Sequence, residues 1–309
     1  MTTVFSHTAC LGHNMGEGHP ERPARMDAVE QALQTEGLAG RLVRRNAERA
    51  TLDCIGLMHP QKYIEQIVAS VPSSGVTRLD ADTCLSPGSL EAALRAVGAA
   101  CSAVDEVILG ESKNAFCAVR PPGHHAETNK AMGFCIFNTV AIAAAYARQK
   151  YGVERVAVID FDVHHGNGTQ EMFWSDQNLL FASTHQMPLY PGTGSKSERG
   201  EFDNIVNCPL IEGDGSSEFR AAISDVILPG LVTFQPDLLL VSAGFDAHMN
   251  DPLAGLNLQD DDYAWVTKQL LEIADKFTNG RLISTLEGGY DLSALSSSVA
   301  SHVEELLQV

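Results

Sequence analysis

The chain has 309 residues, of which 44% are hydrophobic, so it is long enough to bury a sizeable core in one large α/β domain or two smaller ones. The formal net charge of −18 argues against direct nucleic-acid binding, which needs a basic surface, but it permits cationic substrates. The sequence shows neither a secretory signal pattern nor an apolar run long enough to span a bilayer, so we expect a cytoplasmic protein with no membrane partner.

Apolar and amphipathic segments alternate along the chain. Short apolar runs, which predict strands, occupy residues 3–6, 42–44, 115–120, 155–161, 179–183, 204–208, 237–242 and 281–286. Amphipathic segments, which predict helices, occupy residues 89–109, 134–150, 217–234, 260–276 and 293–307. Strands that are apolar on both faces and separated by helices indicate an α/β fold with a parallel sheet covered on each side.

The run at 155–161 leads into a segment rich in metal-binding side chains. Residues 156–168 are Val-Ala-Val-Ile-Asp-Phe-Asp-Val-His-His-Gly-Asn-Gly. If the strand continues through this segment, alternation places Asp160, Asp162 and His164 on one face. Burying a carboxylate without a partner costs roughly several kcal/mol, so we expect a bound cation here.

Three other predicted strands also end in polar residues. His124 and His125 follow the run at 115–120, Asp246 follows the run at 237–242, and Tyr290 follows the run at 281–286. In a doubly wound sheet, ligands bind beyond the carboxyl ends of the strands. These strand ends therefore predict one common site.

The metal-binding residues predicted for this site are Asp162, His164 and Asp246. Three protein ligands leave one or two coordination positions open, which is the arrangement of a catalytic metal. An oxygen, nitrogen, oxygen donor set suits zinc, and also iron(II) or cobalt, so the ligands alone leave the metal open.

Such a metal needs a nearby base to activate water, and His124 and His125 are the candidates. A catalytic histidine also needs its second ring nitrogen held by another group. Asp160 and Asn167 remain from the same segment for that task.

Motifs along nearly the whole chain, in the right order, resemble those of the histone deacetylase superfamily. They are Gly-His-Pro-Glu-Arg-Pro (18–23), Arg-Pro-Pro-Gly-His-His (120–125), Gly-Phe-Cys-Ile-Phe-Asn (133–138), Asp-Phe-Asp-Val-His-His-Gly-Asn-Gly-Thr-Gln (160–170), Tyr-Pro-Gly-Thr-Gly (190–194), Ser-Ala-Gly-Phe-Asp-Ala-His (242–248) and Leu-Glu-Gly-Gly-Tyr (286–290). The asparagine at 167 is similar to the class II branch and its bacterial relatives.

The resemblance implies an arginase-like fold with an eight-stranded parallel sheet, in a single catalytic domain over residues 1–309. It further implies one zinc ion per chain and hydrolysis of an acyl group from a lysine side-chain amine in a protein or peptide. At matching positions it implies that zinc is bound by Asp162, His164 and Asp246. It implies that His125, oriented by Asn167, is general base and then acid, and that His124, partnered by Asp160, is the electrostatic neighbour of His125. Tyr290 would donate its hydroxyl to the substrate carbonyl.

The resemblance also implies substrate and ion contacts. Gly133, Phe134 and Tyr190 would line an acyl-lysine tunnel, and Asp82 would grip the substrate backbone at its rim. Leu253 stands where polyamine-specific relatives carry a glutamate. A potassium ion would be held by Asp160, Ser183 and main-chain carbonyls near Asp162, His164 and Thr184.

Several alternatives remain open. An arginase-like ureohydrolase with two manganese ions would need more aspartates, and an inert acyl-lysine reader is expected to have lost a ligand, a base or the tyrosine. Acetylated polyamines and small acetylated metabolites remain alternative substrates. We expect His13, His19 and His59 to be structural or solvated, and the scattered cysteines to be buried, reduced thiols, with Cys135 either near the acyl pocket or packed in the core.

Overall fold

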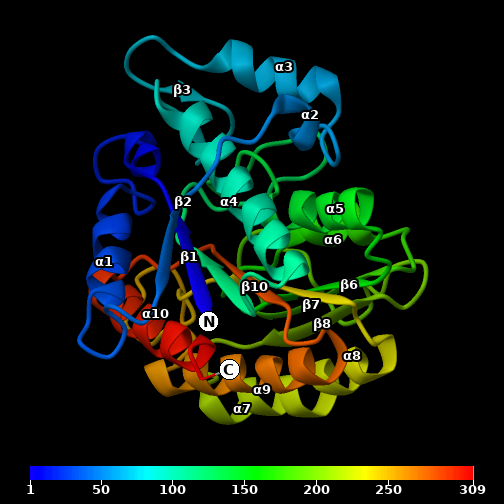
Figure 1. The fold of residues 1–309 in the computed structure, drawn as a ribbon. Helices are drawn as coiled ribbons and strands as arrows, with labels where there is room; N and C mark the ends of the chain where they lie inside the picture. Colours follow the sequence, from blue (N-terminus) through cyan, green and yellow to red (C-terminus); the bar gives the residue numbers. More distant parts are fainter. Residues whose placement is uncertain (309) are drawn as a thin grey trace.

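A central sheet of parallel strands organises the molecule, which confirms the predicted fold class (Figure 1). The structure is a computed structural model that describes residues 1–308; Val309, the last residue of the predicted domain, lies outside them. In spatial order the eight strands are β2 (Val43–Asn46), β1 (Thr2–Ser6), β5 (Asn114–Cys117), β10 (Leu282–Leu286), β9 (Leu238–Ala243), β6 (Val156–Asp160), β7 (Leu179–Gln186) and β8 (Ile205–Leu210).

Helices cover both faces of this sheet (Figure 1). On one face lie α4 (Ser89–Leu109), α5 (Thr139–Tyr151) and α6 (Asn167–Phe173). On the other lie α1 (Ala24–Leu33), α7 (Ser216–Ala222), α8 (Leu228–Phe234), α9 (Asp260–Phe277) and α10 (Leu292–Leu306). Alternate side chains of each strand therefore enter different cores: Val156 and Val158 pack toward α4 and α5, whereas Ala157 and Ile159 pack toward α9 and α10.

A smaller region packs against one end of α4. It contains the 3₁₀ turn η1 (Thr8–Gly12), α2 (Leu52–Ile55), α3 (Gln61–Ser70) and the antiparallel pair β3 (Thr77–Arg78) and β4 (Cys84–Leu85). Ile64 of α3 is buried in one apolar cluster with Leu94 of α4 and Phe137, which precedes α5. These elements, together with α1 and α6, were not predicted from the sequence, because each has ten residues or fewer and offers little periodic signal.

The predicted strand at 155–161 ends at Asp160, so the expected alternation of Asp160, Asp162 and His164 along one strand face is wrong. The Asp162 amide donates to the Asp160 carboxylate at 3.1 Å instead of joining the ladder. A side chain that captures a nearby backbone N–H ends the regular pairing. Asp162 and His164 therefore lie in the loop that follows β6.

Two predicted helices differ from the structure. The helix expected at 134–150 begins at Thr139, because the Asn138 side chain caps it by accepting from the Ala141 amide at 3.1 Å. Phe134, with φ of 69°, lies in the preceding loop. The segment 217–234 is helical but contains a π turn, η2 (Ile223–Ile227), just before Pro229, which has no N–H to donate.

All seven cysteines are free, as expected, but Cys54 is only half-buried, with its Sγ 3.4 Å from that of Cys101. Within residues 1–308, no helix combines the length and apolar character needed to cross a membrane.

Candidate metal centre

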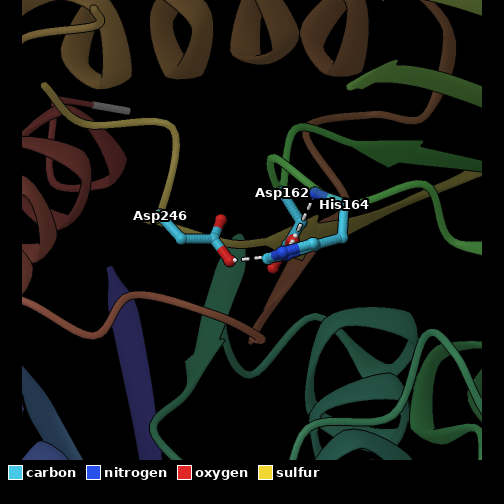
Figure 2. Close-up of side chains that lie close together, drawn as sticks. All are labelled: Asp162, His164 and Asp246. Carbon is cyan, nitrogen blue, oxygen red and sulfur yellow. Dashed lines mark hydrogen bonds and ion pairs between the residues drawn. The ribbon is translucent and has the colours of Figure 1, made fainter. Parts of the chain in front are cut away.

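The predicted metal ligands come together at the carboxyl edge of the sheet, as Figure 2 shows. Asp162 and His164 follow β6, and Asp246 follows β9, which pairs directly with β6. His164 Nδ1 lies 3.1 Å from Asp162 Oδ1 and 3.1 Å from Asp246 Oδ2. One ligand atom from each residue falls within 4.8 Å of the others, close enough to share one ion.

The surrounding backbone holds the two carboxylates in this arrangement. The Gly288 amide donates to Asp162 Oδ2 at 2.8 Å, and the Val163 amide donates to Asp246 Oδ1 at 2.9 Å. A Cβ at Gly288 would lie 2.0 Å from Asp246 Oδ2, and one at Gly244 would lie 2.1 Å from Asp162 Oδ2. Glycine is therefore needed at both positions for the backbone to approach the carboxylates.

Electrostatics also favour a cation at this point. Both carboxylates are almost fully buried. Burial and the charge of Asp162 raise the pKa of Asp246. Burial alone would lower the pKa of His164, but hydrogen bonds to the two carboxylates raise it to about 10. The cluster thus needs a positive charge, which a divalent metal with oxygen and nitrogen ligands would supply.

His124 and His125 follow β5 and differ in what holds their Nδ1 atoms. Nδ1 of His124 lies 2.9 Å from Asp160 Oδ2, and Nδ1 of His125 lies 2.8 Å from Asn167 Oδ1. Burial lowers the pKa of His124, but the carboxylates led by Asp160 raise it well above its usual value. Burial, with the charges of His124 and His164, lowers the pKa of His125 well below its usual value. The second histidine is thus the neutral one.

Tyr290 follows β10 and is 8% exposed. Its ring meets that of Phe134 edge to face at 5.9 Å, and the Arg25 guanidinium lies 4.9 Å from its ring centroid. Burial raises its pKa well above the usual value, against the opposing charge of Arg25. Among residues 1–308 its hydroxyl makes no hydrogen bond, so a protonated donor is available.

The predicted tunnel residues lie beside these side chains. The Tyr190 ring is 5.2 Å from that of His125, and a Cβ at Gly133 would lie 2.3 Å from the same imidazole. Asp82 is half-buried, and burial followed by the charge of Asp80 raises its pKa. Leu253 is half-buried in the loop beyond Asp246, where its amide donates to Asp251 Oδ1 at 3.0 Å.

The predicted potassium residues are also neighbours. Asp160 and Ser183 are paired across β6 and β7, and both are fully buried. Thr184 follows on β7 and is also buried.

Several buried charges around the site were not predicted from the sequence. Glu287 accepts from the amides of Gly123 at 2.6 Å and His124 at 3.2 Å, and burial, partly offset by His124, raises its pKa to about 7. Asp251 accepts from the Tyr290 amide at 2.7 Å. Glu287 directly follows the predicted strand at 281–286, which was the available signal, whereas Asp251 lies nine residues beyond the predicted strand at 237–242.

A buried ion cluster positions the loop that carries Tyr290. Glu21 pairs with Arg120 and, at 3.2 Å, with Arg25. The Arg25 Nε donates to the Gly289 carbonyl at 2.7 Å. Glu21 and Arg25 both belong to the segment around 18–25, in which the sequence analysis assigned no role to either residue.

The remaining histidines have structural partners. His59 Nδ1 lies 3.0 Å from the Thr128 carbonyl, and its Nε2 accepts from the Asn138 amide at 3.0 Å. His13 is buried beside Glu21. His19 Nε2 lies 3.1 Å from the Asp82 carbonyl oxygen, and its ring lies 4.6 Å from that of Phe134.

Comparison with known proteins identifies the family of the chain. A family model of the histone deacetylase domain matches residues 19–306. The chain is 42% identical to the uncharacterized protein slr0245 of Synechocystis sp., over 99% of this chain and all of that protein. It is 38% identical to the histone deacetylase-like amidohydrolase of Pseudomonas aeruginosa, over 99% of this chain and 86% of that protein.

The fold is likewise similar to the crystal structure of the HDA15 HD domain. The TM-score is 0.94 at 34% sequence identity, and the match covers 99% of this chain and 88% of that one. Since the sequence and structural matches both span nearly the whole chain, the protein belongs to the histone deacetylase family.

Proposed function

We propose that this chain is a zinc-dependent amidohydrolase that removes acetyl or other acyl groups from the side-chain amine of lysine in proteins or peptides. The observation that carries the proposal is the convergence of Asp162, His164 and Asp246 on one point, with the His125 ring 6.0 Å from that of His164. Membership of a family whose named relatives include deacetylases and an amidohydrolase supports the reaction class.

The chemistry divides among the residues as follows. A zinc ion held by the three ligands would polarise the acyl carbonyl and make its water more acidic. His125, neutral and held by Asn167, takes the proton of the attacking water and then gives it to the leaving amine. The Tyr290 hydroxyl donates to the oxygen on which negative charge develops.

Metal analysis combined with turnover tests this proposal. The purified protein is expected to carry one zinc ion per chain and to hydrolyse an acetyl-lysine peptide. Asp246→Ala is expected to remain soluble but to lose the metal, because one carboxylate and one imidazole do not hold zinc. Stoichiometric zinc in the variant would refute the ligand set, and a zinc-loaded parent inactive on every acyl-lysine peptide would refute the activity.

Acetylated polyamines are the second candidate substrates, because a net charge of −18 attracts polycations. We favour acyl-lysine, since the apolar side chain of Leu253, after Asp251 and Pro252, cannot pair with a second ammonium group. We expect a higher kcat/KM for an acetyl-lysine peptide than for N8-acetylspermidine, and Leu253→Glu should shift the ratio toward the polyamine. A parent preference for the polyamine of about tenfold, or about 1.4 kcal/mol, would contradict this.

Three further assignments belong to the same proposal. The catalytic domain covers residues 1–309, and the protein is cytoplasmic. A potassium ion lies near Asp160, Ser183 and Thr184, which the burial and strand pairing of Asp160 and Ser183 support.

A further inference from the structure

Three side chains form a continuous hydrogen-bonded chain that leads away from the metal centre. His125 Nδ1 lies 2.8 Å from Asn167 Oδ1, and Asn167 Nδ2 donates to Glu127 Oε1 at 2.8 Å. We call these residues the His125–Asn167–Glu127 relay. Glu127 is half-buried and lies two residues beyond His125.

Glu127 determines which way the Asn167 amide faces. A carboxylate only accepts hydrogen bonds, so the amide must turn its NH2 group toward Glu127 and its carbonyl toward His125. The other neighbours of Asn167 Nδ2 are also acceptors, namely Met132 Sδ at 3.4 Å and the His125 carbonyl at 3.5 Å. All three contacts favour the same orientation.

The amide orientation in turn determines the tautomer of His125. A carbonyl facing Nδ1 requires the proton on Nδ1, which leaves the Nε2 lone pair free to accept a proton. With the amide reversed, the NH2 group would face Nδ1 and move the imidazole proton to Nε2. That tautomer cannot act as a base through Nε2.

We propose that Glu127 is a positioning residue that fixes His125 in its Nδ1-protonated tautomer through Asn167. The inference rests on the proposed function of His125 as the base.

The backbone around the relay is held rigidly, so Glu127 and Asn167 keep their spacing. A Cβ at Gly168 would lie 2.2 Å from the Ala126 carbonyl oxygen, so the two chain segments touch. Glu127 itself is held on its other side, where its backbone amide donates to the Lys130 carbonyl oxygen at 3.0 Å. The backbone next to Glu127 and Asn167 is therefore held in place.

The first test removes the acceptor with Glu127→Ala. Long-range ¹⁵N NMR of the full-length protein, with zinc and after its removal, reports the His125 tautomer directly. We expect the Nδ1-protonated form in the parent and a substantial Nε2-protonated population in Glu127→Ala. We also expect kcat to fall roughly 10- to 100-fold with little change in KM, as for other groups that orient a reacting histidine.

Two variants serve as controls. Glu127→Gln keeps an oxygen that can accept from Asn167 and is expected to restore most of the parent tautomer and kcat. Glu171→Ala, in α6 four residues after Asn167, removes a carboxylate that accepts from the Thr128 amide rather than from the Asn167 side chain. It should change neither the tautomer nor kcat. A parent-like tautomer in Glu127→Ala, or an equal change in Glu171→Ala, would overturn the proposal.

A second test exchanges the amide and the carboxylate between positions 167 and 127, and it does not require Glu127→Ala to fold. Asn167→Asp places two carboxylates where an amide and a carboxylate now meet at 2.8 Å. Adding Glu127→Gln supplies an NH2 donor for the new aspartate and is expected to raise kcat about tenfold above Asn167→Asp alone. Equal effects of Glu127→Gln in both backgrounds would show no coupling and overturn the proposal.

Different results would refute the proposed function and the role of Glu127. A parent inactive on acyl-lysine would refute the proposed function, and the NMR tautomer would still decide whether Glu127 controls His125. An active parent with an unchanged tautomer in Glu127→Ala would refute the role of Glu127 alone.

Discussion

Tyr290 illustrates how single residues are prepared for the proposed reaction. Its phenol is nearly buried, and burial keeps its pKa far above neutrality, although Arg25 lies over the ring. A phenol that stays protonated can donate to an oxygen as negative charge develops. The Asp251 carboxylate holds the backbone amide of the same residue at 2.7 Å, so the loop places the ring firmly.

Tyr290→Phe keeps the ring and deletes only the hydroxyl. Because this donor would be used more strongly in the transition state than in the ground state, kcat should fall by about 10²- to 10³-fold, with little rise in KM. Zinc content and Tm are expected to stay close to those of the parent. Kinetics on an acetyl-lysine peptide check this result.

The matched control for this substitution is Tyr146→Phe, which removes a hydroxyl that donates to Asp105 on the helical surface, away from the metal centre. It should leave kcat unchanged. Activity of Tyr290→Phe within a few-fold of the parent would show that the hydroxyl is not the oxyanion donor.

Residues of the candidate site were predictable where chemistry and position coincided. Asp162, His164 and Asp246 have side chains that prefer metals and follow apolar runs, so the sequence sufficed to group them. Glu127 and Arg25 were not singled out, because an isolated charge in a loop is usually solvated. Their importance depends on contacts with residues distant in sequence, such as Arg25 with Gly289.

The elements bring the site together through their order in the sheet. β5, β10, β9 and β6 are consecutive neighbours, and each is followed by residues of the candidate site. The chain leaves each strand through a loop, and the loops after β9 and β10 need glycine, at Gly244 and Gly288, where they pass the carboxylates. The site is thus specified as much by small residues as by ligands.

Gly288→Ala tests the close approach after β10. Its Cβ would lie 2.0 Å from Asp246 Oδ2 and 2.6 Å from Asp162 Oδ2, so at least one carboxylate must move. We expect zinc affinity to fall roughly 100-fold, as when groups that orient metal ligands are displaced. Competition with a chelator of known affinity measures the change.

Gly230→Ala in α8 is the control, because the nearest atom to its new Cβ is 4.0 Å away. This variant should bind zinc as the parent does and gain stability slightly, by about 0.5 kcal/mol, because alanine suits a helix. Equal zinc affinity in Gly288→Ala and Gly230→Ala would exclude the steric explanation.

Element types were more predictable than element ends. Each of the eight apolar runs overlaps a strand. In the interior strands this is because two buried faces require continuous apolar sequence, whereas the edge strand β2 is mostly exposed. The ends depended on side-chain capture of the backbone, as by Asp160 after β6 and Asn138 before α5. Such captures form only in the folded chain and leave little periodic signal.

At the scale of the whole molecule, stability should depend on pH through buried neutral histidines. Burial lowers the pKa of His302 to about 3, and burial, partly offset by a hydrogen bond to Thr128, lowers that of His59 to about 4. Their unfolded pKa is about 6.5, so the unfolded chain binds protons first as pH falls. The stabilising contribution is complete above that value and is lost as pH falls toward the folded pKa.

As pH falls from roughly 6 to 4, the protonation of each of these two histidines should therefore lower the free energy of unfolding by up to about 1.4 kcal/mol per pH unit. Chemical denaturation across this range measures the slope. His302→Gln removes one titrating group, and its slope should be shallower than the parent's, whatever its absolute stability. An identical slope would contradict a neutral His302 in the folded protein.

The spatial order of the strands has a consequence for how the chain is made. The last two strands of the sheet to be synthesised, β9 and β10, occupy its middle, between β5 and β6. A nascent chain that has reached residue 237 can build only two half-sheets, each with an open edge where a central strand is missing. The candidate metal centre cannot form until those edges are filled, so the growing polypeptide has no complete site with which to capture an ion during translation.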